Sequence, residues 1–276
     1  MRNRCAGAAA ALLLAWASPP ACADPVQTTL TLTVNPLTGH HEINGSHVDR
    51  LIFAPLPLIE LSAATRRSSI RLEGLPPVTF GYNTAGSGAQ STRLAILTAT
   101  YRQALAGGWF VGAGQTIYNQ YTTYQPVSGT YAYTRGVAVV PINGSEAQYS
   151  RVTGARFEAG RVRAWEHTRL EFWAAVNPRM RGNQYTRIPT FNYRCSPGSG
   201  PPPGNGCTQI VNTYADPENG SQVDLVLRVA RRLSKHGELI YGLRYLNYAA
   251  HYDDFPGQLA DRNVGFAPSI GYRLQF

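Results

Sequence analysis

Apolar and polar residues alternate with a period of two along much of the chain. Between residues 223 and 230, Val, Leu, Leu and Val alternate with Asp, Val, Arg and Ala. The same alternation runs through 169–176, 239–246 and 265–276. Because successive side chains of a β-strand point to opposite faces, the pattern predicts strands with one apolar face. Runs of about 11 to 14 residues are long for globular strands but suit strands that cross a membrane at a tilt.

The connections between these runs alternate strictly between short and long. Short turns are expected at 66–69, 104–108, 160–161 and 234–237. Long connections are expected at 35–49, 83–90, 120–147, 178–220 and 252–262. Outer-membrane barrels have this asymmetry, with small periplasmic turns and large outer loops.

Ten strands fit between these connections. They are expected at 26–34, 50–64, 70–82, 91–103, 109–119, 148–159, 162–177, 221–233, 238–251 and 263–276. The sequence therefore predicts an all-β fold, an antiparallel up-and-down transmembrane β-barrel with both ends on the periplasmic side. Eight or twelve strands are the alternatives. Pro55 and Pro57 interrupt the second strand, whereas 131–140 and 185–193 could add two more.

Residues 1–23 have the organisation of a signal peptide. Arg2 and Arg4 precede an apolar run at 8–17, and residues 21–23 (Ala-Cys-Ala) fit a cleavage site. The run is too short to span a bilayer. A lipoprotein is disfavoured because prolines stand at positions 19 and 20. We therefore expect one mature domain, the barrel of residues 24–276, with its longest outer loops at 120–147 and 178–220.

The mature chain contains two cysteines, Cys195 and Cys207, on either side of a segment rich in Pro and Gly. An exported chain meets oxidising conditions, so we predict a disulfide between them, with two free thiols as the alternative.

The chain ends in the hexapeptide Gly-Tyr-Arg-Leu-Gln-Phe, in which Tyr272, Leu274 and Phe276 alternate with other residues. This ending resembles the C-terminal signal of bacterial outer-membrane β-barrel proteins, a terminal Phe preceded by apolar or aromatic residues at every second position. The resemblance implies recognition by the barrel-assembly machinery and location in the outer membrane. It points to no particular subfamily.

The formal charge is +9, or +7 once Arg2 and Arg4 leave with the signal peptide, and Lys235 is the only lysine. Basic proteins often bind nucleic acid, but these arginines are spread at strand spacing and the chain is exported. We expect no nucleic-acid partner. Outer-membrane lipid and anionic lipopolysaccharide are the partners that this charge favours, around a monomeric barrel.

Strand phase predicts which charged residues face the lumen. They are Arg71, Glu73, Arg156, Glu158, Arg163, His167, Arg169, Glu171, Asp224, Arg228, Arg232, Arg244 and Arg273. Eight arginines against four acids leave this interior positive. One interpretation is a narrow pore that favours anions, since rings of arginine select for them. The other is an interior packed with arginine–carboxylate pairs, because side chains can fill a barrel of about ten strands.

Histidines and acids meet in two of the expected outer loops, and this gives a weak metal prediction. The first loop carries His40, His41, Glu42, His47 and Asp49, and the fifth carries His251, Asp253 and Asp254. Such side chains can bind Zn, Ni or Cu ions, although a solvated polar rim has the same composition. We weigh the last three residues as candidates and expect neither a metal nor any other cofactor.

A catalytic site is the weakest of the functional hypotheses. Omptin proteases have ten strands with Asp and His at the outer rim, but the long segment 178–220 contains no His to complete such a site. Lipid-cleaving barrels carry His-x-Ser on a strand, whereas His167 is followed by Thr168 and Arg169. We expect His167 to face the lumen and pair with an acid such as Glu171.

Three functions therefore remain. The first is a small porin-like channel for anionic or small polar solutes. The alternative is a non-channel barrel whose outer loops bind lipopolysaccharide, a host surface or a partner protein. An outer-membrane hydrolase is the least favoured. A secreted β-sandwich would also show alternation, but the strand lengths, the loop asymmetry and Phe276 argue against it.

Overall fold

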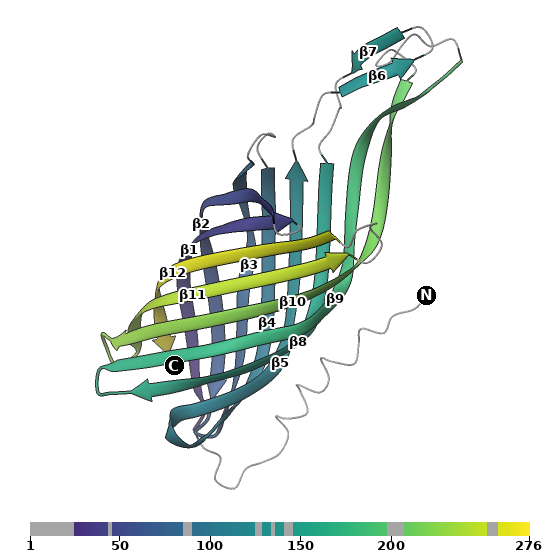
Figure 1. Ribbon diagram of the computed structural model, residues 1–276. Helices are drawn as coiled ribbons and strands as arrows, with labels where there is room; N and C mark the ends of the chain where they lie inside the picture. Colours follow the sequence, from purple (N-terminus) through teal and green to yellow (C-terminus); the bar gives the residue numbers. More distant parts are fainter. Residues whose placement is uncertain are drawn as a thin grey trace.

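The computed structural model describes residues 25–43, 46–84, 90–124, 129–133, 136–140, 146–197, 207–252 and 259–276. Ten strands form a closed antiparallel barrel, and β1 pairs with β12 to close it (Figure 1). The barrel strands are β1 (Gln27–Ile43), β2 (Ser46–Ala64), β3 (Ser68–Thr84), β4 (Gln90–Ala104), β5 (Trp109–Tyr124), β8 (Glu146–Ala164), β9 (Thr168–Cys195), β10 (Cys207–Arg232), β11 (Gly237–Tyr252) and β12 (Leu259–Gln275). The predicted fold and strand number are confirmed.

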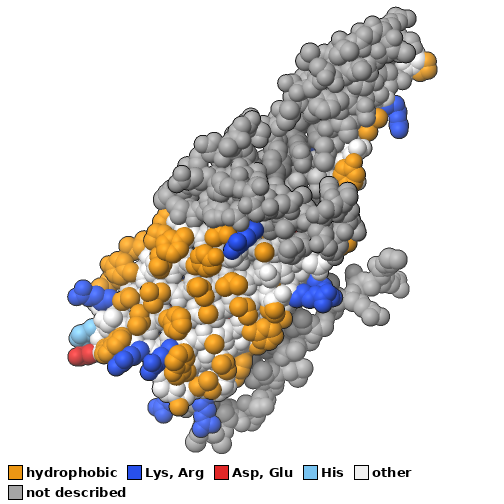
Figure 2. Space-filling model, in the orientation of Figure 1, with side chains coloured by type: hydrophobic (Ala, Val, Ile, Leu, Met, Phe, Trp, Pro, Cys, Tyr) orange, Lys and Arg blue, Asp and Glu red, His pale blue; other side chains and the backbone are white. Residues whose placement is uncertain are grey.

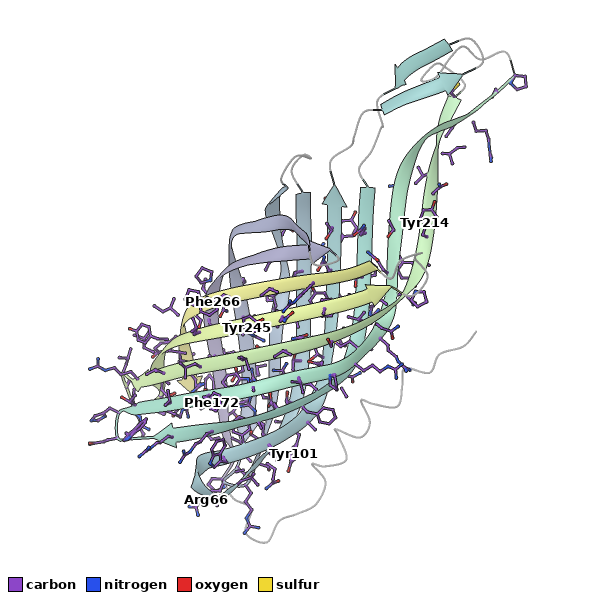
Figure 3. The ribbon with its side chains drawn as sticks, viewed as in Figure 1. Arg66, Tyr101, Phe172, Tyr214, Tyr245 and Phe266 are labelled. Carbon is purple, nitrogen blue, oxygen red and sulfur yellow. The ribbon has the colours of Figure 1, made fainter. Side chains whose placement is uncertain are left out.

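The two faces of the wall differ as the alternation predicts. On β10, Leu225 and Leu227 are exposed on the outside, whereas Asp224 and Arg228 are buried inside. Figure 2 shows hydrophobic side chains spread over the described face of the barrel wall. In Figure 3, Phe172, Tyr245 and Phe266 lie on that wall. An apolar outer wall around a polar interior is the arrangement that a lipid bilayer requires of a barrel.

Four short turns lie at one end of the barrel, and three are close to the predicted positions. The 3-10 helix η1 (Ala106–Gly108) occupies the turn before β5. The fourth turn is corrected, because β8 continues through Gly160 to Ala164 and the chain reverses at residues 165–167. Gly160 serves close packing instead. A Cβ there would lie 2.3 Å from the Phe172 carbonyl oxygen and 2.6 Å from the Phe110 ring.

The segment 178–220, expected as a long loop, is largely paired strand. β9 and β10 remain hydrogen-bonded far beyond the rest of the wall and project from one end of the barrel (Figure 1). Cys195 and Cys207 are cross-strand partners at the end of this ladder, which is the placement that a disulfide needs. The bond itself stays a prediction. Proline, glycine and polar residues made this segment look irregular, but the strand alternation continues through it.

The segment 120–147 also contains strand. It includes the end of β5 and a small separate hairpin of β6 (Gly129–Tyr133) and β7 (Gly136–Val140). These two strands do not join the barrel, so the twelve-strand alternative is wrong.

Residues 1–24 lie outside the described residues, so the signal peptide and the start of the mature chain stay predictions. In the part of the chain that the structure describes, no helix is long and apolar enough to cross a membrane.

Candidate functional site: the barrel interior

The middle of the barrel interior is occupied by a network of ion pairs, which we call the central network. It consists of Glu60, Arg71, Glu73, Arg102, Arg156, Glu158, Asp224, Arg228 and Arg244. These residues come from β2, β3, β4, β8, β10 and β11, so the network ties together strands from much of the circumference.

Asp224 is a shared acceptor at one side of this network. Arg244 donates to it through two nitrogens, with Nε–Oδ1 and Nη2–Oδ2 distances of 2.9 and 2.8 Å. Arg156 Nη2 donates to Oδ2 at 2.8 Å. Asp224 and Arg156 have no exposed surface. Two guanidinium groups therefore satisfy one buried carboxylate, as a charge removed from water requires.

Glu60 is the corresponding acceptor at the other side. Its Oε2 lies 3.1 Å from Arg71 Nε and 2.7 Å from Arg228 Nη1. Glu73 pairs with Arg71 and, at 2.8 Å, with Arg244. Glu73 thus connects the Glu60 side of the network to the Asp224 side.

Trp173 fills the space between these arginines. The guanidinium carbons of Arg71, Arg228 and Arg102 lie 4.7, 4.8 and 5.0 Å from its ring centroid. The indole is 1% exposed. Cations over the face of a desolvated tryptophan are attracted by the ring quadrupole, so Trp173 both packs the interior and helps to hold its arginines.

A second, smaller group of ion pairs lies nearer the short turns. Arg169 Nη2 lies 2.8 Å from Glu238, and Arg273 Nη1 lies 2.8 Å from Glu171 and 3.1 Å from Glu238. Arg273 Nε also donates to Thr31 Oγ1 at 3.0 Å. Since β9, β11, β12 and β1 all contribute, this group closes the interior across the seam where the first and last strands meet.

Apolar side chains fill the interior on the other side of the central network. They are Leu58, Leu75, Leu94, Tyr118, Val152, Met180, Tyr248 and Ala250. The rings of Tyr118 and Tyr248 stack with centroids 4.4 Å apart. Glu218 is buried beside them, accepting hydrogen bonds from Ser150 and, at 2.5 Å, from the Tyr248 hydroxyl. The interior is thus layered, with ion pairs on one side and apolar packing on the other.

The structure places ten of the thirteen predicted lumen residues inside the barrel and corrects three. Arg163 points outward, with its guanidinium 5.2 Å from the Trp165 ring. His167 lies in the turn, mostly exposed, and its Nε2 is 3.6 Å from Glu166 and not paired with Glu171. Both errors follow from the turn expected at 160–161, because moving that turn reverses the strand phase. Arg232 has the inward phase but is exposed at the mouth.

Sequence reasoning missed four interior residues, Glu60, Arg102, Glu218 and Glu238. Arg102 continues the inward phase of Thr98 and Thr100 and could have been found from it. Glu60 was hidden by the prolines before it. With these residues, seven arginines face seven carboxylates among the described interior side chains. The predicted surplus of four positive charges is corrected, because the described interior is balanced.

The remaining predicted sites have mixed outcomes. Tyr272, Leu274 and Phe276 face outward at the end of the chain, with Phe276 73% exposed. Asp253 and Asp254 lie outside the described residues, and of His251 only the backbone, in β11, is described. Among the side chains that the structure describes, no group of three His, Cys, Asp or Glu residues could hold a metal ion. The metal hypothesis stays untested.

No protein-family model and no curated protein sequence matches the chain. Among solved structures, it is similar to the outer membrane protease OmpT from Escherichia coli, with 11% identity, 91% of this chain and 97% of that chain covered, and a TM-score of 0.55. The β domain of the Bordetella autotransporter Brka matches at 16% identity over 91% of this chain and 100% of that chain, with a TM-score of 0.41. The translocator domain of the autotransporter NalP from Neisseria meningitidis matches at 10% identity, over 93% and 90%, with a TM-score of 0.43. Identities this low show likeness of fold alone.

Proposed function

We propose that this chain, which has the fold of a bacterial outer-membrane β-barrel, is a non-conducting barrel. Its projecting β9–β10 hairpin binds a macromolecule at the cell surface. Of the three functions that the sequence left open, the geometry of the interior and of this hairpin supports this one best. A small channel is the alternative that the experiments below distinguish from it.

The observation that carries the proposal is the filled cross-section of the interior. Trp173, Arg156 and Asp224 are almost without exposed surface, and the arginines around them are held by carboxylates on several strands. A barrel of about this size is one that side chains can fill. Because the seven described interior arginines are equalled in number by seven carboxylates, the charge argument for an anion-selective pore is also lost.

The hairpin supports the binding part of the proposal. β9 and β10 stay paired beyond both neighbouring strands. In the described part of the chain, β8 pairs with β9 as far as Arg187, and β11 pairs with β10 from Glu218 onward. Tyr185 and Tyr214 are more than 40% exposed on the hairpin, and Figure 3 shows Tyr214 on the projecting part. Tyrosine combines a large contact area with a hydroxyl and little rotamer entropy, which suits a recognition surface.

Conductance in planar bilayers tests closure. We expect the purified protein to insert without discrete current steps at any applied voltage, because the central network blocks the lumen. A variant in which Trp173 and Arg156 are both replaced by alanine should admit current if it folds. Steady anion-selective steps from the unaltered protein would refute the proposal in favour of a channel.

A truncated hairpin tests binding. Arg187 and Thr213 are direct cross-strand partners, so residues 188–212 can be replaced by an Asn-Gly turn without changing the register below them. A photoreactive phenylalanine analogue at Tyr214 should give an adduct with lipopolysaccharide or a surface protein in intact cells. The adduct should disappear in the truncated chain, while heat-dependent migration in SDS gels shows that the barrel still folds. Equal adduct formation by the truncated chain would contradict the role of the hairpin.

A further inference from the structure

The seam between β2 and β3 is interrupted. At its outer end residues 49–51 pair with residues 84–82, and near the short turns residues 59–64 pair with residues 74–69. Residues 52–58 of β2 and 75–81 of β3 have no ladder partner across this seam. Both strands stay paired on their other sides in this region, as in Leu56 with Asn35 and Val78 with Leu94. The break is therefore a property of one seam and not of a frayed end.

Prolines explain why the seam does not close. Pro55 and Pro57 lie in the unpaired part of β2, and Pro76 and Pro77 lie in the unpaired part of β3. Proline has no N–H to donate to a ladder, so it belongs at edges and bulges. β3 has such an irregularity between Leu75 and Val78 in its pairing with β4. Both strands therefore carry two prolines in the unpaired stretch, and the N–H groups that these residues lack weaken the ladder there.

A cavity lies directly behind the interrupted seam. Its volume is about 50 Å³, and its lining includes Leu58, Leu75, Leu94, Glu73 and Arg244. Leu58 and Leu75 belong to the unpaired stretches themselves, so the seam forms one wall of the cavity. On the β12 side, Gly265 and Ala267 are too small to fill the space. Most of the lining is aliphatic, which is unusual for the lumen of a membrane barrel.

The charged side of this cavity offers no free charge to a ligand. Glu73 Oε1 and Arg244 Nη2 lie 2.8 Å apart, and Arg244 is also held by two bonds to Asp224. An anion or a cation would have to break these pairs. A cavity with aliphatic walls, in which the Glu73–Arg244 pair is already neutralised, instead suits an uncharged hydrocarbon group.

The end of the unpaired stretch nearest the short turns lies at the depth of the lipid. The unpaired part of β3 begins at Leu75, seven residues after the strand starts at Ser68. At a rise of about 3.3 Å per residue and a tilt of about 40°, this lies roughly 18 Å from the periplasmic end of the strand, within the outer half of an apolar band about 25 Å tall. Pro77 and Ile59, on either side of the seam, are exposed on the outer face.

We propose that the β2–β3 seam is a lateral entrance through which the end of one aliphatic hydrocarbon chain passes from the membrane into the cavity. The cavity holds the end of such a chain, and the remainder stays in the seam between the prolines. The chain comes either from a membrane phospholipid or from a free lipid-soluble compound such as a fatty acid. This inference does not rest on the surface-binding role of the β9–β10 hairpin, and its test leaves that hairpin unchanged.

Photolabelling of the full-length folded protein in vesicles tests the entrance. Two probes carry a diazirine at the chain terminus. One is free palmitic acid dissolved in the bilayer, and the other is a phosphatidylcholine with the same group in one acyl chain. We expect labels on the inward-facing Leu58, Leu75 and Leu94. Labels on the outward-facing Leu72 and Leu97 serve as the internal reference, since those side chains contact lipid in any case.

Filling the cavity provides the matched variant. Ala267→Trp should abolish labelling of the inward leucines and leave the reference labels unchanged, whereas Leu61→Trp, at an outward-facing position that is not a reference, should leave both unchanged. Leu75→Phe replaces Ala267→Trp if heat-dependent gel migration shows that the latter does not fold.

Each outcome decides the proposal. Inward labels from phosphatidylcholine identify a phospholipid chain as the occupant, because its headgroup stays in the bilayer and only the chain can reach inside. Inward labels from palmitic acid alone identify a free lipid-soluble compound. Absence of inward labels with both probes overturns the entrance, as does inward labelling that persists when the cavity is filled.

Discussion

Arg156 and Asp224 stand 68 residues apart in the chain, yet their side chains meet at 2.8 Å inside the barrel and neither is exposed. Asp224 is the acid that Arg156 shares with Arg244. Removing it leaves two guanidinium groups without their common partner, and the side chain of one of them, Arg156, has no exposed surface.

Asp224→Ala is therefore expected to destabilise the barrel by about 3–5 kcal/mol, the usual loss when one member of a buried ion pair is removed. Urea unfolding in detergent, followed by tryptophan fluorescence, measures this free energy of unfolding. Glu166→Ala is the matched control, because that carboxylate is exposed in a turn and its loss should change stability by roughly 0.5 kcal/mol or less. Equal effects of the two changes would mean that the central network contributes no stability.

Gly160 and Gly74 give a second matched pair. A Cβ at Gly160 would meet Phe172 and Phe110 at 2.3 and 2.6 Å, whereas at Gly74 the nearest atom would be 3.9 Å away. We expect Gly160→Ala to destabilise the barrel by about 1–3 kcal/mol through overpacking. Gly74→Ala should be neutral or slightly stabilising, since alanine restricts the unfolded chain more than glycine. The thermal unfolding temperatures of the two variants test this expectation. A Gly160→Ala variant as stable as the unaltered protein would support the turn first expected at 160–161.

Leu227 tests the lipid-facing phase of β10. It is 43% exposed on the outer wall, so Leu227→Arg should cost about 2–4 kcal/mol if the site is near the bilayer midplane. Ser221→Arg, on the same face but further along the strand, should cost about 0–1 kcal/mol. Folding equilibria in lipid vesicles compare the two. A larger penalty for Ser221→Arg would move the apolar band along the strand.

Cys195 and Cys207 test the end of the projecting hairpin. Their direct pairing in the β9–β10 ladder leads us to expect an intramolecular disulfide in protein isolated from the outer membrane. Closing a loop of this length adds about 3 kcal/mol to the local stability of the hairpin. Peptide mapping without reductant should recover the two cysteines in one linked peptide. Proteases should cleave the hairpin faster in Cys195→Ser than in the unaltered protein. Two separately alkylated thiols would contradict the bond.

The strand alternation was enough to predict the barrel, because a wall between lipid and a polar interior permits only one residue pattern. It also placed Asp224, Arg228 and Arg273 inside. The prediction from alternation was wrong near Gly160, because a glycine can either form a turn or allow close packing within a strand. Gly160 looked like a turn residue, and the resulting shift of phase misplaced Arg163 and His167.

Pairing partners were beyond the reach of the sequence. Glu60 and Arg228 are separated by 168 residues, and only closure of the barrel brings them to 2.7 Å. The interrupted seam was visible in part, since Pro55 and Pro57 already indicated a bent or bulged second strand. That Pro76 and Pro77 lie across from them, with a cavity behind, depends on the register between β2 and β3.

The balance of positive and negative charges in the interior determines where the net charge of the chain produces an electric field. With its described buried charges cancelling, a polypeptide of net charge +9 must carry its excess on the outer surface, at the rims or in the segments beyond the barrel. On the described outer surface the only carboxylate side chain is that of Glu166, whereas arginines such as Arg161 and Arg66 are exposed there. Figure 3 shows Arg66 near the short turns. We therefore expect phosphate-bearing headgroups around the protein, rather than solutes within it, to be the first anions to experience that field.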